Sequence, residues 1–160
     1  MLRKVKLLRQ QFSVSTAMDD IDTQILDILR GNGRASFASI GETVGLSPHG
    51  TADRVRRLER DGVITGYTVE VDPDRVGRPV DALVDIRLLG STDPDEFERL
   101  AAGLPAVTEI VFLTGRFDFQ LRLACNDAED LDRTVRKVRR EGGVAATETR
   151  IAMRSARLER

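Results

Sequence analysis

The stretch LSPHGTADRVRRLERDGVITGY, residues 46–67, decides the fold of the N-terminal part of the chain. Ser47 can cap a helix, and Pro48 suits the first helical position because its missing N–H needs no partner there. Asp61-Gly62 then ends the helix. Between these signals lie four arginines within seven residues: Arg54, Arg56, Arg57 and Arg60. They form either a solvated helix face or a surface that binds something negatively charged.

The helix expected over residues 48–60 has two chemically different sides. At about 100° per residue, Ala52, Val55 and Leu58 point toward a core. The opposite side carries Gly50, Asp53, Arg54 and Arg57, with His49 and Arg60 beside them. Arginine can bind a phosphate or a guanine edge with two hydrogen bonds, which suits a helix in the DNA major groove. The alternative is that these arginines only pair with acids on a wet surface.

Two shorter helical patterns precede this helix. Asp19 or Asp20 can cap the first, and Ser36 can cap the second, which ends at Gly45. Their apolar residues recur at helical spacing: Ile21, Ile25, Ile28 and Leu29, then Phe37, Ile40 and Val44. Two short helices joined by a tight glycine turn predict a helix-turn-helix. After it, alternating apolar residues over 63–71 predict a wing and a linking strand.

The overall composition sets limits on the function. The chain has 160 residues, a net charge of −1, and a single cysteine, so no internal disulfide can form. This fits a reducing cytoplasm, where we expect the protein to act. No apolar run approaches the roughly 18 residues that a membrane helix needs, so no membrane partner is expected.

The local charge counts against DNA binding. Residues 18–79 hold eight arginines and eleven acids, a net of 8 − 11 = −3. A positive field must therefore be confined to one face, with the acids of the first helix expected to face away. A small footprint per subunit makes pairing of subunits an expectation.

Residues 79–157 show a different pattern, in which short apolar strands alternate with two helices. The strands are expected over 80–89, 107–114, 117–125 and 147–153, and the helices over 94–103 and 127–141. The order βαββαβ predicts a ferredoxin-like sheet. The expected fold class is α+β, an N-terminal winged helix-turn-helix joined to this C-terminal domain. A single helical layer leaves one sheet face open, and a partner subunit is the obvious cover.

Residues 18–157 resemble the Lrp/AsnC family, also called feast/famine regulators. The matching pieces are MDDIDTQILDILRGNGRAS, IGETVGLS, RVRRLERDGVITGY, VDPDRVGRPV, LPAVTEIVFLTGRFDFQL and TETRIAM. The resemblance implies a DNA-binding transcriptional regulator of double-stranded DNA whose oligomeric state or DNA affinity responds to an amino acid or related metabolite. It also implies homodimers that assemble into larger even-numbered oligomers, often octamers.

The resemblance also implies roles for particular residues. Ser47 matches the cap of the recognition helix, Arg54 and Arg57 match its basic positions, and Arg56 is expected to add a phosphate contact. The variable, specificity-setting positions match His49, Gly50 and Asp53. The effector turn matches Thr114, Gly115, Arg116, Phe117 and Asp118, with Thr147 and Thr149 on the last strand close by.

The chemistry of the turn is consistent with an amino-acid site. Asp118 can accept a hydrogen bond from the ligand ammonium, and main-chain N–H groups near Gly115 can donate to its carboxylate. Arg116 either pairs with Asp118 and closes the site or projects into solvent. The structural alternative is that Gly115 only makes the hairpin turn and Asp118 orders it.

Catalysis has little support in the sequence. The one histidine and the one cysteine lie in different predicted domains, and no phosphate loop, dinucleotide fingerprint or metal-ligand spacing is present. We therefore expect no enzyme, no metal and no cofactor. Two alternatives stay open: an enzyme similar to haem-pathway decarboxylases on the same two-domain plan, and a metabolite-binding co-regulator that never touches DNA.

The expected domain boundaries follow these patterns. Residues 18–66 form the winged helix-turn-helix, residues 67–78 the linking strand and hinge, and residues 79–160 the effector-binding and oligomerisation domain. Residues 1–17 are basic and contain no acid. They are either a basic arm or upstream sequence from a wrongly assigned start codon. The second interpretation is favoured, because a compact fold can begin cleanly at Met18.

Overall fold

The computed structural model describes residues 18–154. They form two compact units that divide between Glu70 and Val71. The expectations for residues 1–17 lie outside the described residues. No helix in the described part of the chain is long and apolar enough to cross a membrane.

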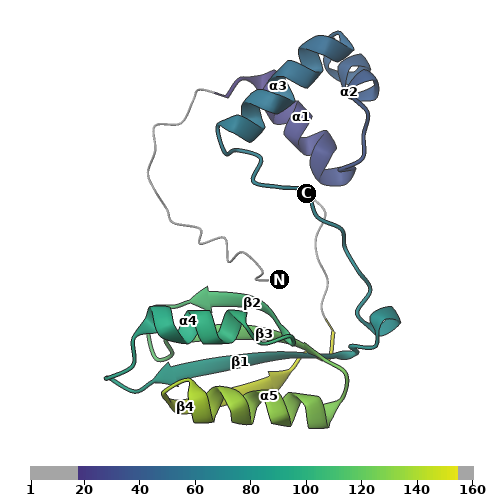
Figure 1. Cartoon of the computed structure of the whole chain (residues 1–160). Coiled ribbons are helices and arrows are strands. Elements are labelled where there is room, and N and C mark those ends of the chain that lie inside the picture. The colour runs from purple at the N-terminus through teal and green to yellow at the C-terminus, as the bar shows by residue number, and fades with distance from the viewer. Residues whose placement is uncertain (1–17, 155–160) are drawn as a thin grey trace. The chain divides into compact units, whose positions relative to one another are not determined.

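The N-terminal unit is a bundle of three helices (Figure 1). These are α1 (Asp20–Gly31), α2 (Phe37–Val44) and α3 (Pro48–Arg60). Each begins at a predicted cap: the side chains of Asp19, Ser36 and Ser47 each accept a hydrogen bond from a main-chain N–H in the first turn. Such bonds satisfy donors that would otherwise lack a partner at a helix start. The helix-turn-helix is confirmed.

The core of this unit is small and tightly packed. Ile25, Ile40, Val55 and Leu58 are all at most 2% exposed. The turn between α2 and α3 closes over Gly41, where an added Cβ would lie 2.5 Å from the carbonyl oxygen of Leu46. Only glycine fits there without a shift of the backbone. This close approach fixes the angle at which α3 leaves α2, and therefore which side of α3 is exposed.

The wing expected after α3 is not formed, because residues 61–79 contain no strand. Tyr67, Val69 and Val71 are 56%, 79% and 56% exposed, respectively. A strand needs a neighbouring strand to pair with its N–H and C=O groups, and the sheet of the described residues contains only β1 to β4. Side-chain and main-chain contacts tie the segment back: the Tyr67 hydroxyl donates to Glu59 at 2.8 Å, and the Ile64 N–H donates to the Leu58 carbonyl at 3.0 Å. A short 3₁₀ helix, η1 (Asp74–Val76), precedes the second unit.

The C-terminal unit has the predicted βαββαβ order. Its elements are β1 (Val80–Leu88), α4 (Pro94–Ala102), β2 (Val107–Phe112), β3 (Phe119–Cys125), α5 (Ala128–Glu141) and β4 (Val144–Ile151). The strands form one antiparallel sheet in the order β2-β3-β1-β4. Figure 1 shows α4 and α5 on the same face of this sheet.

The core lies between the sheet and its two helices. Alternate residues of β1 and β3 point into it, among them Val84, Ile86 and Leu121, each at most 1% exposed. Phe97 of α4 stacks at a tilt on Phe119 of β3, with 4.8 Å between ring centroids. The remaining residues of each strand point to the opposite face, which no helix or strand of the described residues covers.

Candidate functional site

Arg54 and Arg57 on α3 turn toward α1 rather than away from the domain. Asp22 of α1 is 0% exposed and lies between them. Arg54 Nη1 lies 2.6 Å from Asp19 Oδ2 and 3.0 Å from Asp22 Oδ1. Arg57 Nη2 lies 2.5 Å from Asp22 Oδ2. We call these four residues the Asp22 cluster.

The Asp22 cluster corrects one expectation from the sequence. The acids of α1 were expected to face away from α3, and for Asp19 and Asp22 this is wrong. A helical projection gives the direction of each Cβ, but a long arginine stem can bend back over a neighbouring helix. A buried carboxylate requires such partners, because an unpaired charge there is very costly. The hydrogen bond from Arg54 also holds the pKa of Asp19 below its usual range, so this carboxylate is charged at neutral pH.

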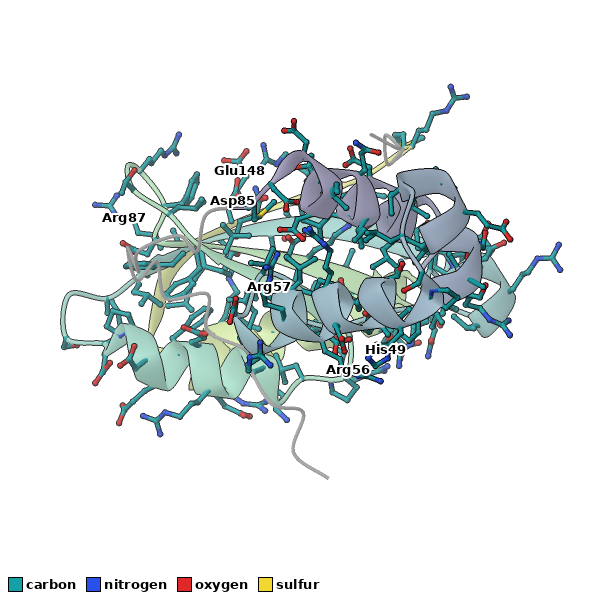
Figure 2. The ribbon with its side chains drawn as sticks, turned by 90° about the horizontal axis from the view of Figure 1, so that it is seen from above. His49, Arg56, Arg57, Asp85, Arg87 and Glu148 are labelled. Carbon is teal, nitrogen blue, oxygen red and sulfur yellow. The ribbon has the colours of Figure 1, made fainter. Side chains whose placement is uncertain are left out.

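The other side of α3 is open to solvent. The side chains of His49, Asp53, Arg56 and Arg60 are 85%, 58%, 62% and 72% exposed. Asp53 bonds to Arg56 at 3.1 Å and lies 3.4 Å from Nε2 of His49. Figure 2 shows His49 and Arg56 on the opposite side of α3 from Arg57, which faces α1. We call this side the open side of α3.

The predicted DNA-contacting residues therefore divide into two groups. His49, Gly50, Asp53 and Arg56 lie on the open side or at its start, whereas Arg54 and Arg57 belong to the Asp22 cluster. Ser47 uses its hydroxyl to cap α3, accepting from the Gly50 N–H at 3.1 Å. The sequence prediction omitted Arg60 from the contact set, although its exposure and helical spacing from Arg56 place it on the same side.

The turn over residues 114–118, between β2 and β3, is ordered by Asp118. Its carboxylate accepts a hydrogen bond from the Leu88 N–H at 2.7 Å, which joins the turn to β1. Its main-chain N–H donates to the Ile86 carbonyl, and its carbonyl accepts from the Leu113 N–H, both at 2.8 Å. Asp118 thus has the ordering role that was the structural alternative. The carboxylate still has lone pairs available, because two oxygens offer about four acceptor sites.

The other predicted turn residues are more open. Thr114, Gly115 and Arg116 are exposed, and Gly115 has a φ of +113°, a region that favours glycine. The guanidinium of Arg116 lies 5.2 Å from the centroid of the Phe117 ring, a cation–π distance. This ring contact sets the direction of Arg116 in the described chain.

The threonines on β4 lie at the same end of the sheet as the turn. Thr147 pairs with Ile86 of β1, and Ile86 pairs on its other side with Phe119, the residue after Asp118. Thr149 pairs with Val84, two residues before Ile86 on β1, and is exposed on the edge strand. One strand therefore separates Thr147 from the turn. Within one chain these residues share an end of the sheet but do not enclose a ligand.

The uncovered sheet face carries a second buried carboxylate, Asp85 on β1, which is 5% exposed. Gln120 donates to Asp85 Oδ1 at 2.8 Å, and Arg150 of β4 forms an ion pair with it. Glu148 lies directly opposite Asp85 in the strand register, and Figure 2 shows the two close together. Nearby, Arg122 binds Asp81 through two hydrogen bonds of 3.0 and 2.6 Å. We call this surface the charged sheet face.

The sequence analysis did not identify the charged sheet face as a site. A signal was present in VDALVDIRLL, where Asp81, Asp85 and Arg87 fall on one side of an alternating strand. The arginine partners come from other strands, so the ion pairs themselves required the fold.

The described residues offer no metal site, since no three His, Cys, Asp or Glu side chains in that part of the chain gather suitably. Cys125 is fully buried, and burial raises the pKa of its thiol to about 11. A thiol in that state is a poor nucleophile and a poor ligand at neutral pH.

Known proteins share both units. Residues 18–59 match the AsnC-type helix-turn-helix domain, and residues 81–160 match the Lrp/AsnC ligand binding domain. A helix-turn-helix followed by a ligand-binding βαββαβ domain defines a class of ligand-responsive transcriptional regulators. The chain belongs to the Lrp/AsnC family of this class, and the resemblance seen in the sequence is confirmed.

Two curated relatives illustrate the similarity. The HTH-type transcriptional regulator AldR of Mycobacterium tuberculosis is 34% identical over 135 residues, which cover 82% of this chain and 75% of that protein. The leucine-responsive regulatory protein of Haemophilus influenzae is 38% identical over 114 residues, covering 69% of this chain and 68% of that protein. Both relatives are named as regulators.

Solved structures agree with the fold. The structure of B. subtilis LrpC matches with a TM-score of 0.80 and 27% identity, covering 88% of this chain and 98% of that one. A Neisseria meningitidis transcriptional regulator in complex with L-Met matches with a TM-score of 0.83 over 89% of this chain and 94% of that one. At 24% identity, this second likeness shows the fold alone.

Proposed function

We propose that this protein binds double-stranded DNA through the open side of α3 and that an amino acid or related metabolite changes its DNA occupancy. The observation that supports this most directly is the capped, exposed polar side of α3 in a unit that matches the AsnC-type helix-turn-helix domain. Such a regulator would work in the cytoplasm, beside the chromosome.

The two groups of α3 residues would contribute differently to DNA binding. Arg56 and Arg60 are exposed and can reach phosphates with little rearrangement. His49, Gly50 and Asp53 would meet base edges, where Asp53 can accept from a cytosine amino group. Arg54 and Arg57 each retain N–H donors beyond those bound to Asp19 and Asp22, since a guanidinium has five. They would add phosphate contacts only with their outer edges, while Ser47 sets the start of the helix.

The DNA proposal is tested by fluorescence anisotropy on the gene's own upstream duplex and on a scrambled duplex, across salt concentrations. Arg56→Gln should weaken binding to both duplexes and reduce the slope of log K against log salt by about 0.9, the value for one phosphate contact. Arg30→Gln is a matched control, because Arg30 is an exposed arginine of α1 paired with Asp27. A folded protein that binds neither duplex would instead support the co-regulator alternative.

The effector proposal places an amino acid at the 114–118 turn, with a neighbouring subunit completing the site. Asp118 would accept from the ammonium, and N–H groups near Gly115 would donate to the carboxylate. Arg116 and Phe117 would line the approach, with Thr147 and Thr149 at the same end of the sheet. The exposure of the turn in a single chain supports a site finished by another subunit.

A substitution can separate the two roles of Asp118. Asp118→Asn retains an oxygen that accepts from the Leu88 N–H but removes the negative charge that an ammonium requires. We expect this variant to keep its thermal stability and lose the shift in melting temperature caused by a pool of the twenty amino acids. Asp118→Ala should lose both. An unchanged ligand response in Asp118→Asn would remove Asp118 from the ammonium site.

The oligomer proposal concerns the charged sheet face. We propose that a second copy covers this face to form a homodimer, and that dimers assemble further into even-numbered oligomers, up to octamers. Asp85 is already desolvated in one chain, so adding a protein layer above it costs less than burying a hydrated carboxylate would. Sedimentation velocity across protein concentrations tests this, and a monomer at all concentrations would contradict it.

A further inference from the structure

A cleft of about 320 Å³ lies in the C-terminal unit, at the opposite end of the sheet from the 114–118 turn. It is formed where β1 and β2 begin and where β3 passes into α5. The strand register shows this position, because Val80 pairs with Cys125 and Val107 with Leu123. Leu104 and Ala106 line it and are buried, so its floor is apolar. We call it the Arg78 cleft.

The Arg78 cleft is positively charged. Three cations line it, Arg78, Arg133 and Lys137, against one acid, Asp130, for a net of 3 − 1 = +2. They come from different segments: Arg78 precedes β1, and Arg133 and Lys137 lie one turn apart on α5. This contrasts with the chain as a whole, whose net charge is −1.

Asp130, the single acid that lines the cleft, already accepts hydrogen bonds from two neighbours. Asp130 accepts from the Asn126 N–H at 3.1 Å and from Arg133 Nη2 at 2.7 Å. The hydrogen bond from Asn126, followed by that from Arg133, lowers the pKa of Asp130, so this carboxylate is charged and offsets Arg133. Asp127, three residues earlier, uses its side chain to cap α5. The excess charge of the cleft therefore belongs to Arg78 and Lys137.

Arg78 and Lys137 both have N–H donors that remain available to a ligand. Arg78 uses Nη1 to bind the Pro105 carbonyl at 2.9 Å, which holds the guanidinium at the cleft and leaves its other N–H groups available. Lys137 makes no hydrogen bond or ion pair within the described residues. Its charge does contribute, after the hydrogen bond from Arg140, to the lowered pKa of Glu141. Thr134 donates its hydroxyl to the Asp130 carbonyl, so its oxygen can still accept.

We propose that the Arg78 cleft is a second small-molecule site, separate from the effector turn, that binds a compact dianion such as a dicarboxylate or a phosphorylated metabolite. Arg78 takes one anionic group through a fixed guanidinium edge, and Lys137 takes the other as a point charge. Pockets of ordinary ligands begin at about 300 Å³, so the volume limits the guest to a small metabolite. Because Arg78 directly follows the segment between the units, a bound dianion would also hold the end of that segment.

Isothermal titration calorimetry of the full-length protein tests this inference. One titration uses succinate and another uses inorganic phosphate, each compared with sodium chloride at matched ionic strength. We expect saturable binding of at least one of the two, which also shows whether carboxylate or phosphate is preferred. Heat no greater than that of sodium chloride for both probes would overturn the proposal.

Two substitutions locate the binding. Lys137→Glu should weaken the binding roughly tenfold or more, since a charge-assisted hydrogen bond contributes about 1.5–3 kcal/mol. Arg136→Glu is the matched control, because it changes the charge by the same amount and Arg136 is the neighbouring arginine of α5, pairs with Asp132 and does not line the cleft. Equal affinity in Lys137→Glu and Arg136→Glu would place the dianion elsewhere and overturn the assignment.

Two further results would show that a macromolecule occupies the cleft. If Lys137→Glu changes the assembly size in sedimentation velocity, the cleft receives an acidic segment of a second copy. If it flattens the salt dependence of DNA binding, the cleft receives a DNA phosphate. Either result overturns the small-dianion proposal, and neither bears on the effector turn, which Asp118→Asn tests separately.

Discussion

The Asp22 cluster and the charged sheet face solve the same electrostatic problem in different surroundings. Each centres on a buried aspartate bound by arginine: Asp22 at 0% exposure and Asp85 at 5%. Asp22 has two arginines from one facing helix, whereas Asp85 has one arginine and the amide of Gln120. Asp85 also faces Glu148, a like charge in the strand register.

The difference separates a cluster that is complete within one chain from a surface that remains uncovered in one chain. The Asp22 cluster lies between two helices of one unit, so its charges balance within a single chain. The charged sheet face has a surplus of polar groups, and none of the helices and strands between residues 18 and 154 covers it. We therefore expect the first to control the stability of the helix-turn-helix and the second to control association between copies.

The largest expected effect comes from Asp22→Ala. Removing the carboxylate leaves Arg57 without its partner and Arg54 with Asp19 alone, and it removes the acceptor that closes the capping box of α1. Breaking a buried ion pair costs about 3–5 kcal/mol, and the partial exposure of the arginines reduces this to about 2–4 kcal/mol in the free energy of unfolding. Urea denaturation, combined with hydrogen exchange of the N-terminal unit, measures the loss.

A matched control for this variant is Asp27→Ala on the same helix. Asp27 pairs with Arg30, and both side chains are more than half exposed. Its loss should change the free energy of unfolding by less than about 0.5 kcal/mol. If the two variants behave alike, the Asp22 cluster does not organise the unit and the comparison with Asp85 fails.

The next effect concerns Asp85→Ala and rests on the proposed dimer. Losing the carboxylate leaves Arg150 and Gln120 without a partner under the second copy. We expect dimer dissociation to become easier by about 2 kcal/mol, roughly thirtyfold in Kd, as measured by sedimentation equilibrium. Asp132→Ala on the outer side of α5 serves as control. If the free energy of unfolding of the monomer falls while the Kd of the dimer is unchanged, the charged sheet face stabilises the single chain, as the Asp22 cluster does, and does not control association.

The sequence predicted local features well because their causes are local. The cap at Ser47 depends on a residue three positions away, and the apolar periodicity of α3 correctly placed Ala52, Val55 and Leu58 in the core. The order βαββαβ followed from alternating patterns of the same short range. These features set the class of fold and located α3 and the 114–118 turn.

The sequence could not predict contacts made between distant elements. The partners of Arg54 and Arg57 lie 32 to 35 positions away, on a helix whose crossing angle no periodicity reveals. The same holds for Asp118, whose carboxylate binds a main-chain N–H 30 positions earlier. The expected wing failed for a related reason, since alternation over residues 63–71 predicts a strand only if a neighbour is available.

Cys125 extends the comparison to a buried titratable group that, unlike Asp22 and Asp85, is not bound to an arginine of the described residues. Desolvation, with Asp130 adding to it, raises its thiol pKa from 9.0 to about 11. The folded state thus binds the proton more tightly, so its stability contribution is complete below pH 9 and is lost as pH rises through 11. We expect wild-type unfolding free energy to fall by about 1 kcal/mol more than that of Cys125→Ala between pH 8 and pH 10.

Urea denaturation at pH 8, 9 and 10 measures this difference, with chloride held constant. At pH 8, the thiol of the folded protein should also resist a disulfide reagent until urea exposes it, because a buried neutral thiol is unreactive. Parallel pH curves for wild type and Cys125→Ala would show that Cys125 ionises in the fold as easily as in the unfolded chain.

The smallest expected effect comes from Asp19→Asn, which tests the rim of the Asp22 cluster. Asparagine caps helices as well as aspartate does, so the bond to the Asp22 N–H is retained and only the charge that faces Arg54 is lost. Asp19 has a lowered pKa in the fold, so its charge stabilises the protein above its usual titration range and this contribution is lost as pH falls through the folded value. The variant should therefore match wild type in strong acid and fall slightly below it near neutrality, as thermal unfolding across that pH range would show. An effect as large as that of Asp22→Ala would mean that the exposed carboxylate, not the buried one, holds α3 against α1.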